Sequence, residues 1–506
     1  MNMPQRYFCT TALPYVNASP HLGFVLELVQ TDAYARFLRL KGHKVYYLTG
    51  ADENSLKNVL TAKEKGLPVQ EFVNQNAERF RHLKEAFHLS YDDFIRTTEE
   101  RHKKGVLKLW QKIFDQGDIY KKNYEGLYCI GCEAFYKENE LINGFCPEHK
   151  NTKPIVVKEE NYFFKLSRYQ KEIEQIIAND KIKIVPEFRK NEILNFIKQG
   201  LEDFSISRSQ ERAGNWGIRV PNDENQIIYV WFDALTNYIS ALGYGENSSL
   251  FTQWWEEGEV IHFIGKGISR FHAIYWPAML LSAGLPLPQT IFIHGYLTIT
   301  GEKISKSQGA IIDPFELVKT YDPEVIRYFL LREFSPFEDG DFSFNRLNER
   351  YTSDLSLGLG NLISRIMSLG DNYHRAINLA SNSLAVENFE GQTLMSHLQN
   401  KLQNYDQAFY EFRFNDAVAS LWELVSLLDK YITFTKPWVK IEQAETVLAN
   451  LVLILVEIIY HLQPIMPEIS RRVLEDLQLG AVVDRTYDKQ TIFLKKISPL
   501  FPRRDK

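Results

Sequence analysis

Residues 6–24 read RYFCTTALPYVNASPHLGF, and this stretch decides the fold. Its first six residues have the pattern of a short strand, and the prolines at positions 14 and 20 then mark a loop. A helix is predicted to follow, and Gly42 lies just beyond its expected end. The apolar residues that recur down one side of this helix are Val25, Val29, Ala33, Phe37 and Leu40.

A second short apolar strand is predicted at residues 45–48, followed by Thr49-Gly50-Ala51-Asp52. Strand, helix and strand in this order predict an α/β fold with a parallel, doubly wound, Rossmann-like sheet. More strands are expected at 227–232, 260–265 and 290–294, with a helix at about 269–283. The sheet is therefore split, and its ligands are expected beyond the carboxyl ends of the strands.

The rest of the chain divides around these two halves. Long amphipathic segments, such as 417–435 and 445–462, indicate a C-terminal α-helical bundle. The expected parts are 1–115 for the first half of the sheet domain, 116–225 for an insertion, 226–300 for the second half, 301–350 for a lysine–serine loop and linker, and 351–506 for the bundle.

Composition narrows the class of protein. The 506 residues are 44% hydrophobic and 24% charged, which excludes a disordered chain. The net charge is −5, so a nucleic-acid site would have to be a local patch. The longest dense apolar run, 451–456, is far shorter than the about 20 residues of a membrane span, and no signal peptide is recognised. We therefore expect no membrane partner and a cytoplasmic location.

Three of the four cysteines cluster, which in a reducing compartment indicates metal binding. Cys129 and Cys132 form one short pair, and Cys146 and His149 form another after a loop. Three thiolates and one imidazole fit one tetrahedral Zn²⁺, and because all four positions are filled the zinc should be structural. The alternative is a loop with unpaired thiols.

Two further motifs carry chemistry. Pro20-His21-Leu22-Gly23-Phe24 opens the first helix, where free backbone N–H groups and the helix dipole favour a phosphate. Residues 301–307, GEKISKS, follow the strand at 290–294 and form a cationic loop that could neutralise a phosphate leaving group. Taken alone, each motif is more often a packed loop–helix junction or a solvated turn.

Together, His-x-Gly and Lys-x-Ser-Lys-Ser resemble the two signatures of class I aminoacyl-tRNA synthetases. The segments around them resemble the methionyl-tRNA synthetase family, and this resemblance runs from residue 6 to about 475. The segments are ALPYVN at 12–17, LTG at 48–50, YVWFDA at 229–234, FH at 271–272 and YWP at 275–277.

The resemblance implies ligation of L-methionine to tRNA(Met) with ATP and Mg²⁺. It implies that His21, Lys303 and Lys306 are catalytic, and that Asp52 holds the substrate ammonium group. The implied ATP-binding residues are His21, Gly23, His294, Gly295, Lys303, Ser305 and Lys306. The implied methionine-binding residues are Leu13, Tyr15, Asp52, Trp231, Ala234, Tyr238, His272 and Trp276, whose aromatic rings suit a polarisable thioether; ordinary core packing is the alternative.

The bundle resembles the anticodon-binding domain of the same family. Asn361, Arg365, Pro437 and Trp438 match the segments that read the anticodon, and unpaired bases are recognised by aromatic stacking and by hydrogen bonds to their edges. The alternative is a Pro-Trp pair that staples two helices. Because the chain stops soon after the bundle, we expect a monomer.

Several residues depart from the family pattern on the nucleotide-facing side. Phe24 replaces a second histidine, Asn54 and Ser55 replace His-Gly, Gly267 replaces an aspartate, and Ala310 replaces an asparagine. Loss of one donor that stabilises the transition state can cost roughly 10²–10³ in rate. A second hypothesis therefore stays open, namely a catalytically weakened paralogue that binds tRNA or methionine.

A ligase for another amino acid is the third hypothesis. Cysteinyl-tRNA synthetases share the class signatures, and Cys9 on the first strand resembles their pattern, but their zinc ligands are scattered along the chain. The isoleucine, leucine and valine enzymes carry a large editing insertion, for which 506 residues leave little room.

Overall fold

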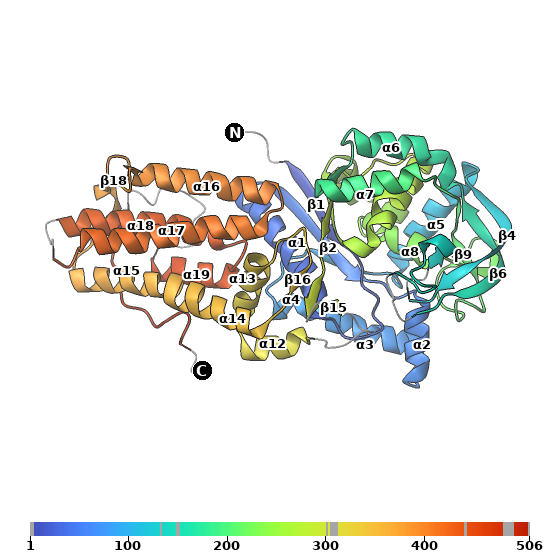
Figure 1. Ribbon diagram of the computed structural model, residues 1–506, viewed down its shortest axis with the longest axis horizontal. Coiled ribbons are helices and arrows are strands. Elements are labelled where there is room, and N and C mark those ends of the chain that lie inside the picture. Colours follow the sequence, from blue (N-terminus) through green and yellow to red (C-terminus); the bar gives the residue numbers. More distant parts are fainter. Residues whose placement is uncertain are drawn as a thin grey trace.

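The computed structural model describes residues 5–131, 134–147, 152–299, 312–439, 443–478 and 490–503, and the backbone of 302–303. The molecule is elongated, with an α/β body at one end and a bundle of long helices at the other (Figure 1). Strand β1 and helix α1 lie near the middle, where the two parts meet. The loop that precedes α1 is therefore close to the centre of the molecule.

A six-stranded parallel sheet forms the centre of the body, in the order β3-β2-β1-β12-β13-β7. Strand β1 pairs with β2 on one side and with β12 on the other, so it joins the two halves of the split sheet. This confirms the predicted parallel α/β sheet. The strands are β1 Arg6–Thr11, β2 Lys44–Ala51, β3 Asp93–Arg96, β7 Lys183–Val185, β12 Glu259–Gly265 and β13 Thr290–His294.

The strand predicted at 227–232 is wrong in its second half. Strand β11 (Asp223–Ile228) ends early, and helix α8 (Val230–Leu235) begins two residues later. Strand β11 also pairs antiparallel with β9 (Ser207–Ser209) and β10 (Arg219–Val220) in a separate sheet. The aromatic residues here have strand propensity, but their burial against the core of the body determines the local structure.

The edge strand β7 was not predicted. It comes from the inserted segment and pairs with β13, so the insertion contributes to the central sheet. Three residues are too few to show a period-2 pattern. The helix expected at 269–283 is divided into a π-helical turn, Phe271–Tyr275, and α11, Trp276–Ser282.

The insertion contains a four-stranded antiparallel sheet in the order β5-β4-β6-β8. Its long hairpin-like pair, β4 and β6, is registered from Ile119 opposite Phe164 to Tyr128 opposite Ile155. The elements of this part are β4 Ile119–Cys129, β5 Ala134–Tyr136, β6 Ile155–Phe164, α6 Gln170–Ala178, α7 Glu187–Lys198 and β8 Phe204–Ser205.

Further helices and short strands surround the central sheet. Those of the body are α1 Leu22–Leu40, α2 Leu56–Glu64, α3 Val69–Arg81, α4 Leu83–Ala86, α5 Glu100–Asp115, α9 Asn237–Ser240 and α10 Ser249–Phe251. Those between the body and the bundle are β14 Leu297–Ile299, β15 Glu302–Lys303, α12 Pro314–Thr320, α13 Pro323–Glu333, β16 Gly340–Asp341 and α14 Phe344–Arg350.

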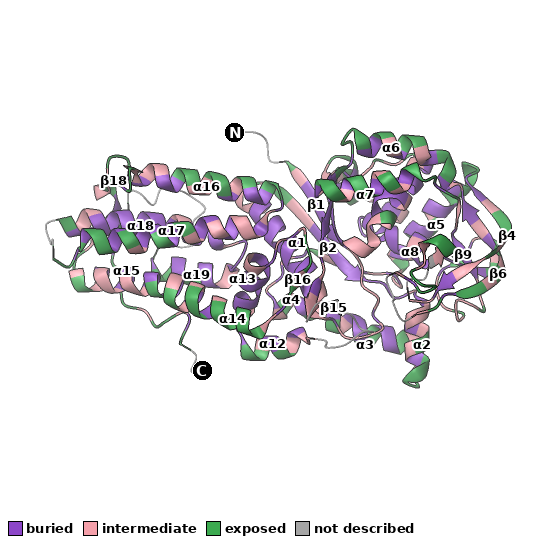
Figure 2. Cartoon of the chain, viewed as in Figure 1, coloured by how far each residue is buried: buried purple, intermediate pink, exposed green. Residues whose placement is uncertain are grey.

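The C-terminal part is helical, as predicted. Its main elements are α15 Gly360–Tyr373, α16 Leu394–Tyr410, α17 Phe414–Thr435, α18 Ala444–Leu462 and α19 Pro467–Asp476. Its short strands are β17 Ile377–Asn378, β18 Asn388–Phe389, β19 Gln392–Thr393 and β20 Thr491–Ile492. Among the described residues, α18 alone has the length and apolar composition of a membrane span, but it packs against α15, α17 and α19 and is mostly buried (Figure 2). It is the core helix of the bundle.

A buried ion pair joins the two parts of the molecule. Asp32 of α1 and Arg327 of α13 are fully buried, and Arg327 Nη1 lies 2.8 Å from Asp32 Oδ2. Arg327 also donates to the carbonyl oxygens of Pro464 and Ile465, at 2.9 Å each, in the loop that follows α18. Burial acts to raise the pKa of Asp32, but Arg36 and Arg327 outweigh it and hold that pKa at about 2.

Replacement of Arg327 by leucine should strongly destabilise the protein. The Arg327→Leu change removes one of the two arginines that pair with buried Asp32 and leaves Arg36 as the other, and breaking a buried pair typically costs about 3–5 kcal/mol. Urea denaturation measures this loss as a lower free energy of unfolding. Arg471→Leu, which removes the two exposed ion pairs of Arg471 with Glu468 and Glu475 on α19, is the control and should leave the transition almost unchanged. Equal effects of the two changes would contradict the role given to Arg327.

Candidate active site

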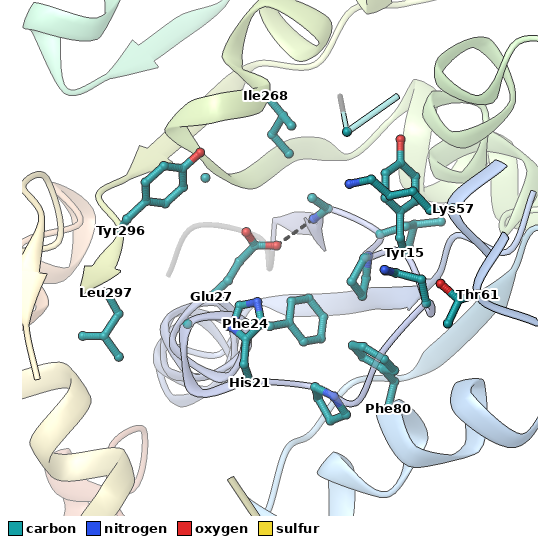
Figure 3. Close-up of a pocket in the computed structure, with 18 of the residues that line it drawn as sticks. Tyr15, His21, Phe24, Glu27, Lys57, Thr61, Phe80, Ile268, Tyr296 and Leu297 are labelled. Atoms are coloured by element: carbon teal, nitrogen blue, oxygen red, sulfur yellow. Dashed lines mark hydrogen bonds between the residues drawn. The ribbon is translucent and has the colours of Figure 1, made fainter. Parts of the chain in front are cut away.

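A cavity of about 580 Å³ lies beyond the carboxyl ends of β1, β12 and β13. Its walls come from the first loop, the start of α1, helix α2 and the segments after β12 and β13. Figure 3 shows Tyr296 and Leu297 on one side, Tyr15 and Lys57 on the other, and α1 between them. This is the position at which an open parallel sheet binds its ligand.

His21 begins helix α1 at the floor of the cavity. Its Nδ1 accepts a hydrogen bond from the backbone N–H of Phe24 at 3.3 Å, so the side chain caps the helix. His21 and Gly23 both line the cavity. The first turn of α1 therefore presents N–H groups and the positive end of the helix dipole, which together favour a phosphate.

Phe24 makes part of the same wall apolar. Its ring packs edge-to-face against Phe80 with centroids 5.5 Å apart, and both rings line the cavity. A phenyl ring offers no hydrogen bond to a phosphate oxygen. The cavity thus keeps the donors at the start of α1 and has an apolar contact surface beside them.

Glu27 and His294 connect the two halves of the site, and the role of Glu27 was not predicted. Glu27 is buried on α1, accepts a hydrogen bond from the Ala12 N–H at 2.9 Å, and lies 2.9 Å from Nε2 of His294. His294 Nδ1 donates to the Gly295 carbonyl at 2.7 Å. Glu27 lies off the apolar stripe of the first helix, so the sequence held no local signal for its role.

Gly295 follows β13, and the backbone of Glu338 passes close to it. A Cβ atom at this position would lie 2.0 Å from the carbonyl oxygen of Glu338, so no larger residue fits without moving the backbone. Among the other predicted ATP-binding residues, Lys303 ends β15, which pairs with β14 beside the cavity. The side chain of Lys303, and Ser305 and Lys306 entirely, lie outside the described residues.

Of the eight predicted methionine-binding residues, two line the cavity and the other six are not part of its lining. Leu13 and Tyr15 line the cavity, and Tyr15 forms a β-bridge with Asp52. The ring centroids of Trp231 and His272 are 6.4 Å apart. Trp231 also stacks on Phe271, with ring centroids 3.8 Å apart. The remaining members are buried, namely Asp52, Ala234, Tyr238, His272 and Trp276.

The polar groups of this pocket carry no positive charge at neutral pH. Because His272 Nδ1 donates to the carbonyl of Ile268 at 3.0 Å, its Nε2 accepts from the hydroxyl of Tyr238 at 2.7 Å. Burial lowers the pKa of His272 to about 4. The same effect holds the pKa of His262, whose ring is 4.2 Å from that of Tyr238, well below its usual range. An uncharged, aromatic pocket suits a thioether.

Replacement of His272 should change the acid sensitivity of the fold. The folded-state pKa of His272 lies below its unfolded value, so stability is fully present above about pH 6.5 and is lost as the pH falls toward 4. His272→Gln removes this contribution to the free energy of unfolding. It amounts to up to roughly 3 kcal/mol, because a shift of one pKa unit corresponds to about 1.36 kcal/mol. Urea denaturation at pH 7 and pH 5 should show a smaller difference than in the parent. The exposed His82→Gln variant is the control, and an unchanged pH dependence in His272→Gln would contradict the assignment.

A series of hydrogen bonds between side chains links the segment around Asp52 to helices α8 and α9. The Asn54 side-chain N–H donates to Asp233 Oδ2 at 2.8 Å, and Asp233 Oδ1 lies 2.5 Å from Nε2 of His102. His102 Nδ1 lies 2.8 Å from Oγ of Ser240. The backbone N–H of Asn54 also donates to Asp52 at 3.3 Å. The chain thus ties Asp52 to α8 and α9, which carry Trp231, Ala234 and Tyr238.

His102 was not predicted, because a single histidine on an amphipathic helix has no distinctive pattern. His102→Ala should displace α8 and α9, and we expect KM for methionine, the substrate that the family resemblance implies, to rise roughly tenfold, or about 1.4 kcal/mol, with less change in KM for ATP. Pyrophosphate exchange measures both constants. His102→Gln should recover part of the loss. A variant that melts at a lower temperature yet keeps the parental KM would reduce His102 to a packing residue.

Two of the four predicted zinc ligands are described. Cys129 ends β4 and is fully buried, and Cys146 is fully buried after a tight turn bridged by Ile142 and Phe145. Cys132 and His149 lie outside the described residues, and no cluster of three or more His, Cys, Asp or Glu is found within them. Gly131 and Thr152, beside this segment, line the cavity.

The predicted anticodon-binding residues lie in the bundle, away from the cavity. Asn361 is exposed on α15, and Arg365 on the same helix forms an ion pair with Asp429 of α17. Pro437 is buried just after α17, and Trp438 is 54% exposed. The structure therefore leaves the Trp438 ring accessible at this end of the bundle, together with the exposed ring of Phe434.

Comparisons with known proteins match this chain to tRNA ligases along most of its length. The family model of class I tRNA synthetases (M) matches residues 7–154 and 148–367, and that of the anticodon-binding domain of tRNA ligases matches 391–502. Methionine–tRNA ligase of Thermotoga maritima is 40% identical over 92% of this chain and 74% of its own. The chain belongs to the methionine–tRNA ligases.

Other members of this methionine–tRNA ligase family are similar over nearly all or all of their length. The Brucella suis enzyme is 38% identical over 94% of this chain and 92% of its own. Mycobacterium tuberculosis methionyl-tRNA synthetase in complex with methionyl-adenylate superimposes with a TM-score of 0.90 at 35% identity, covering 99% of this chain and 100% of that one. The overall fold is therefore that of a methionine–tRNA ligase.

Proposed function

We propose that the chain activates L-methionine with ATP in the cavity at the start of α1 and transfers it to the 3′ end of tRNA(Met). One observation carries this proposal: a cavity that contains the start of α1 is bordered by Ile268, whose carbonyl binds His272 of a buried aromatic cluster, and burial keeps that histidine neutral. The two surfaces fit the nucleotide and the side chain of a methionyl-adenylate. The M. tuberculosis relative holds that compound.

In the first step the methionine carboxylate attacks the α-phosphate of ATP, and pyrophosphate leaves with the bonding electrons. His21 and the N–H groups of α1 stabilise the transferring phosphate. Lys303 and Lys306 neutralise the charge that develops on pyrophosphate, and Mg²⁺ bound with ATP would add positive charge there. In the second step the 2′-hydroxyl of the terminal adenosine attacks the carbonyl carbon, and AMP leaves. Positioning and electrostatics supply the catalysis.

Methionine is held at both ends. Asp52, buried at the carboxyl end of its strand, pairs with the substrate ammonium group. Leu13, Tyr15, Trp231, Ala234, Tyr238, His272 and Trp276 surround the thioether. Tyr238 donates to His272, and His272 donates to a backbone carbonyl. No unpaired charge from these two side chains therefore faces the sulfur.

A structural Zn²⁺ in the insertion is part of the proposal. Cys129 and Cys146 are both fully buried thiols, which suits two of the four ligands, and Cys132 and His149 would complete the set. The metal would hold the segment that borders the cavity and would take no part in the reaction. Cys146→Ser should lower the zinc content measured by atomic absorption and lower the melting temperature; an unchanged metal content would contradict the site.

The bundle reads the anticodon in this proposal. Trp438 supplies an exposed stacking face next to buried Pro437, and Asn361 and Arg365 reach base edges. The match of residues 391–502 to an anticodon-binding domain supports this assignment for Pro437 and Trp438, whereas Asn361 and Arg365 precede the matched range. We further propose that the enzyme works in the cytoplasm, where tRNA and ATP are found, and as a monomer, which light scattering would test.

Methionine-dependent exchange of labelled pyrophosphate into ATP tests the activity. Exchange with methionine, and much weaker exchange with norleucine or cysteine, is the expected result. Retained tRNA binding without exchange would instead identify a paralogue that has lost its chemistry.

His21→Asn separates the two roles of His21. Asparagine is a good N-cap, so α1 should keep its start, while the imidazole that faces the phosphate is lost. The exchange rate should fall by roughly 10²–10³. Phe24→Leu, an apolar change on the neighbouring wall, is the control and should keep most of the rate. Parental exchange in His21→Asn would show that this residue only caps the helix.

A further inference from the structure

A second hollow, of about 490 Å³, lies on the helical bundle far from the first. Its floor is one face of α17, including Trp422, Ser426 and Lys430, and α16 and the β18–β19 hairpin form one side. Helices α16, α17 and α15 run along the bundle together (Figure 1). We call this hollow the α17 groove.

The α17 groove is cationic on a chain that is acidic overall. Arg332, Lys401 and Lys430 line it against two carboxylates, Glu390 and Glu423, whereas the whole chain has a net charge of −5. The Nε of Arg332 is buried and has no hydrogen-bond partner within the described part of the chain. An unused donor and a local excess of positive charge both favour an anionic ligand.

The two lysines are held in pairs that another anion could replace. Lys430 Nζ lies 3.0 Å from Glu390, and Lys401 pairs with Glu423. All four side chains are between about one-third and two-thirds exposed, and exposed pairs of this kind contribute only about 0–1 kcal/mol. Exchange of a glutamate for a phosphate would therefore cost little.

Rigid elements position these charges. The indole N–H of Trp422 donates to the Asp354 carbonyl at 3.1 Å, and its ring lies 4.5 Å from that of Tyr328. Glu390 sits at the turn of the hairpin, with a φ of 46° followed by Gly391 at 86°, and its carboxylate lies 3.0 Å from Lys430 Nζ on α17. The groove is thus preformed.

The groove continues the proposed anticodon surface. Asp429, which pairs with Arg365, directly precedes Lys430 on α17, and Trp438 follows the end of the same helix. Most of the lining lies within residues 391–502, which match the anticodon-binding domain. A polyanion seated on Arg365 and Trp438 would therefore pass along the groove.

We propose that the α17 groove binds backbone phosphates of the anticodon arm of tRNA, through Lys430, Lys401 and Arg332. These contacts position the arm and carry no sequence information, unlike the base contacts expected of Asn361 and Arg365. This inference rests on the proposed function, because it takes tRNA as the partner.

Charge variants of the intact enzyme test it with an unmodified tRNA(Met) transcript. Lys430→Ala and Lys401→Ala should each weaken binding roughly threefold and reduce the salt slope of log K by about 0.7–0.9. Glu390→Gln and Glu423→Gln should have the opposite sign and tighten binding, because they remove repulsion of the phosphates. Arg471→Ala, on α19, is the matched control and should change neither quantity.

Pyrophosphate exchange without tRNA separates this inference from the proposed function. All five variants should keep the parental exchange rate, so a general loss of exchange would concern the activity and not the groove. Unchanged affinity and salt slope in both lysine variants would overturn the inference. So would weaker binding in the Glu→Gln variants, because the pairs would then serve only to hold the hairpin on α17.

Discussion

The buried pair between Asp32 and Arg327 is the contact on which the arrangement of this molecule depends. Asp32 lies on α1, three turns from the helix start that faces the cavity, and Arg327 donates to the loop after the bundle core helix α18. A movement of the bundle relative to the body would break hydrogen bonds to a charge that has no access to water. The pair therefore holds the cavity and the helical bundle in one fixed relation.

Two adjacent surfaces of the site differ in charge. The start of α1 presents a partial positive charge, while the pocket behind it contains histidines that burial keeps neutral. A substrate with a charged head and an uncharged side chain can thus be oriented before any reaction. Phe24 makes part of the cavity wall apolar on the side proposed for the nucleotide. Among the departures from the family pattern, Phe24 changes the wall of the cavity directly.

Much of this could be predicted from the sequence, because the decisive features were local. The first strand, loop and helix, the parallel order of the sheet and the helices at 417–435 and 445–462 all follow from periodicity and turn residues. Strand β7 was missed because it is too short, and the end of β11 was misplaced because burial outweighed strand propensity. Glu27 and His102 act through partners more than 100 residues away, which no local pattern shows.

The central position of β1 has a consequence for synthesis of the protein on the ribosome. Its partner β12 lies far along the chain, since Thr10 and His262 are 252 residues apart. While the intervening segment is being made, β1 is an open edge strand that exposes unpaired N–H and C=O groups and apolar side chains. In the nascent chain this edge of the N-terminal half therefore stays uncovered until the second half of the sheet emerges.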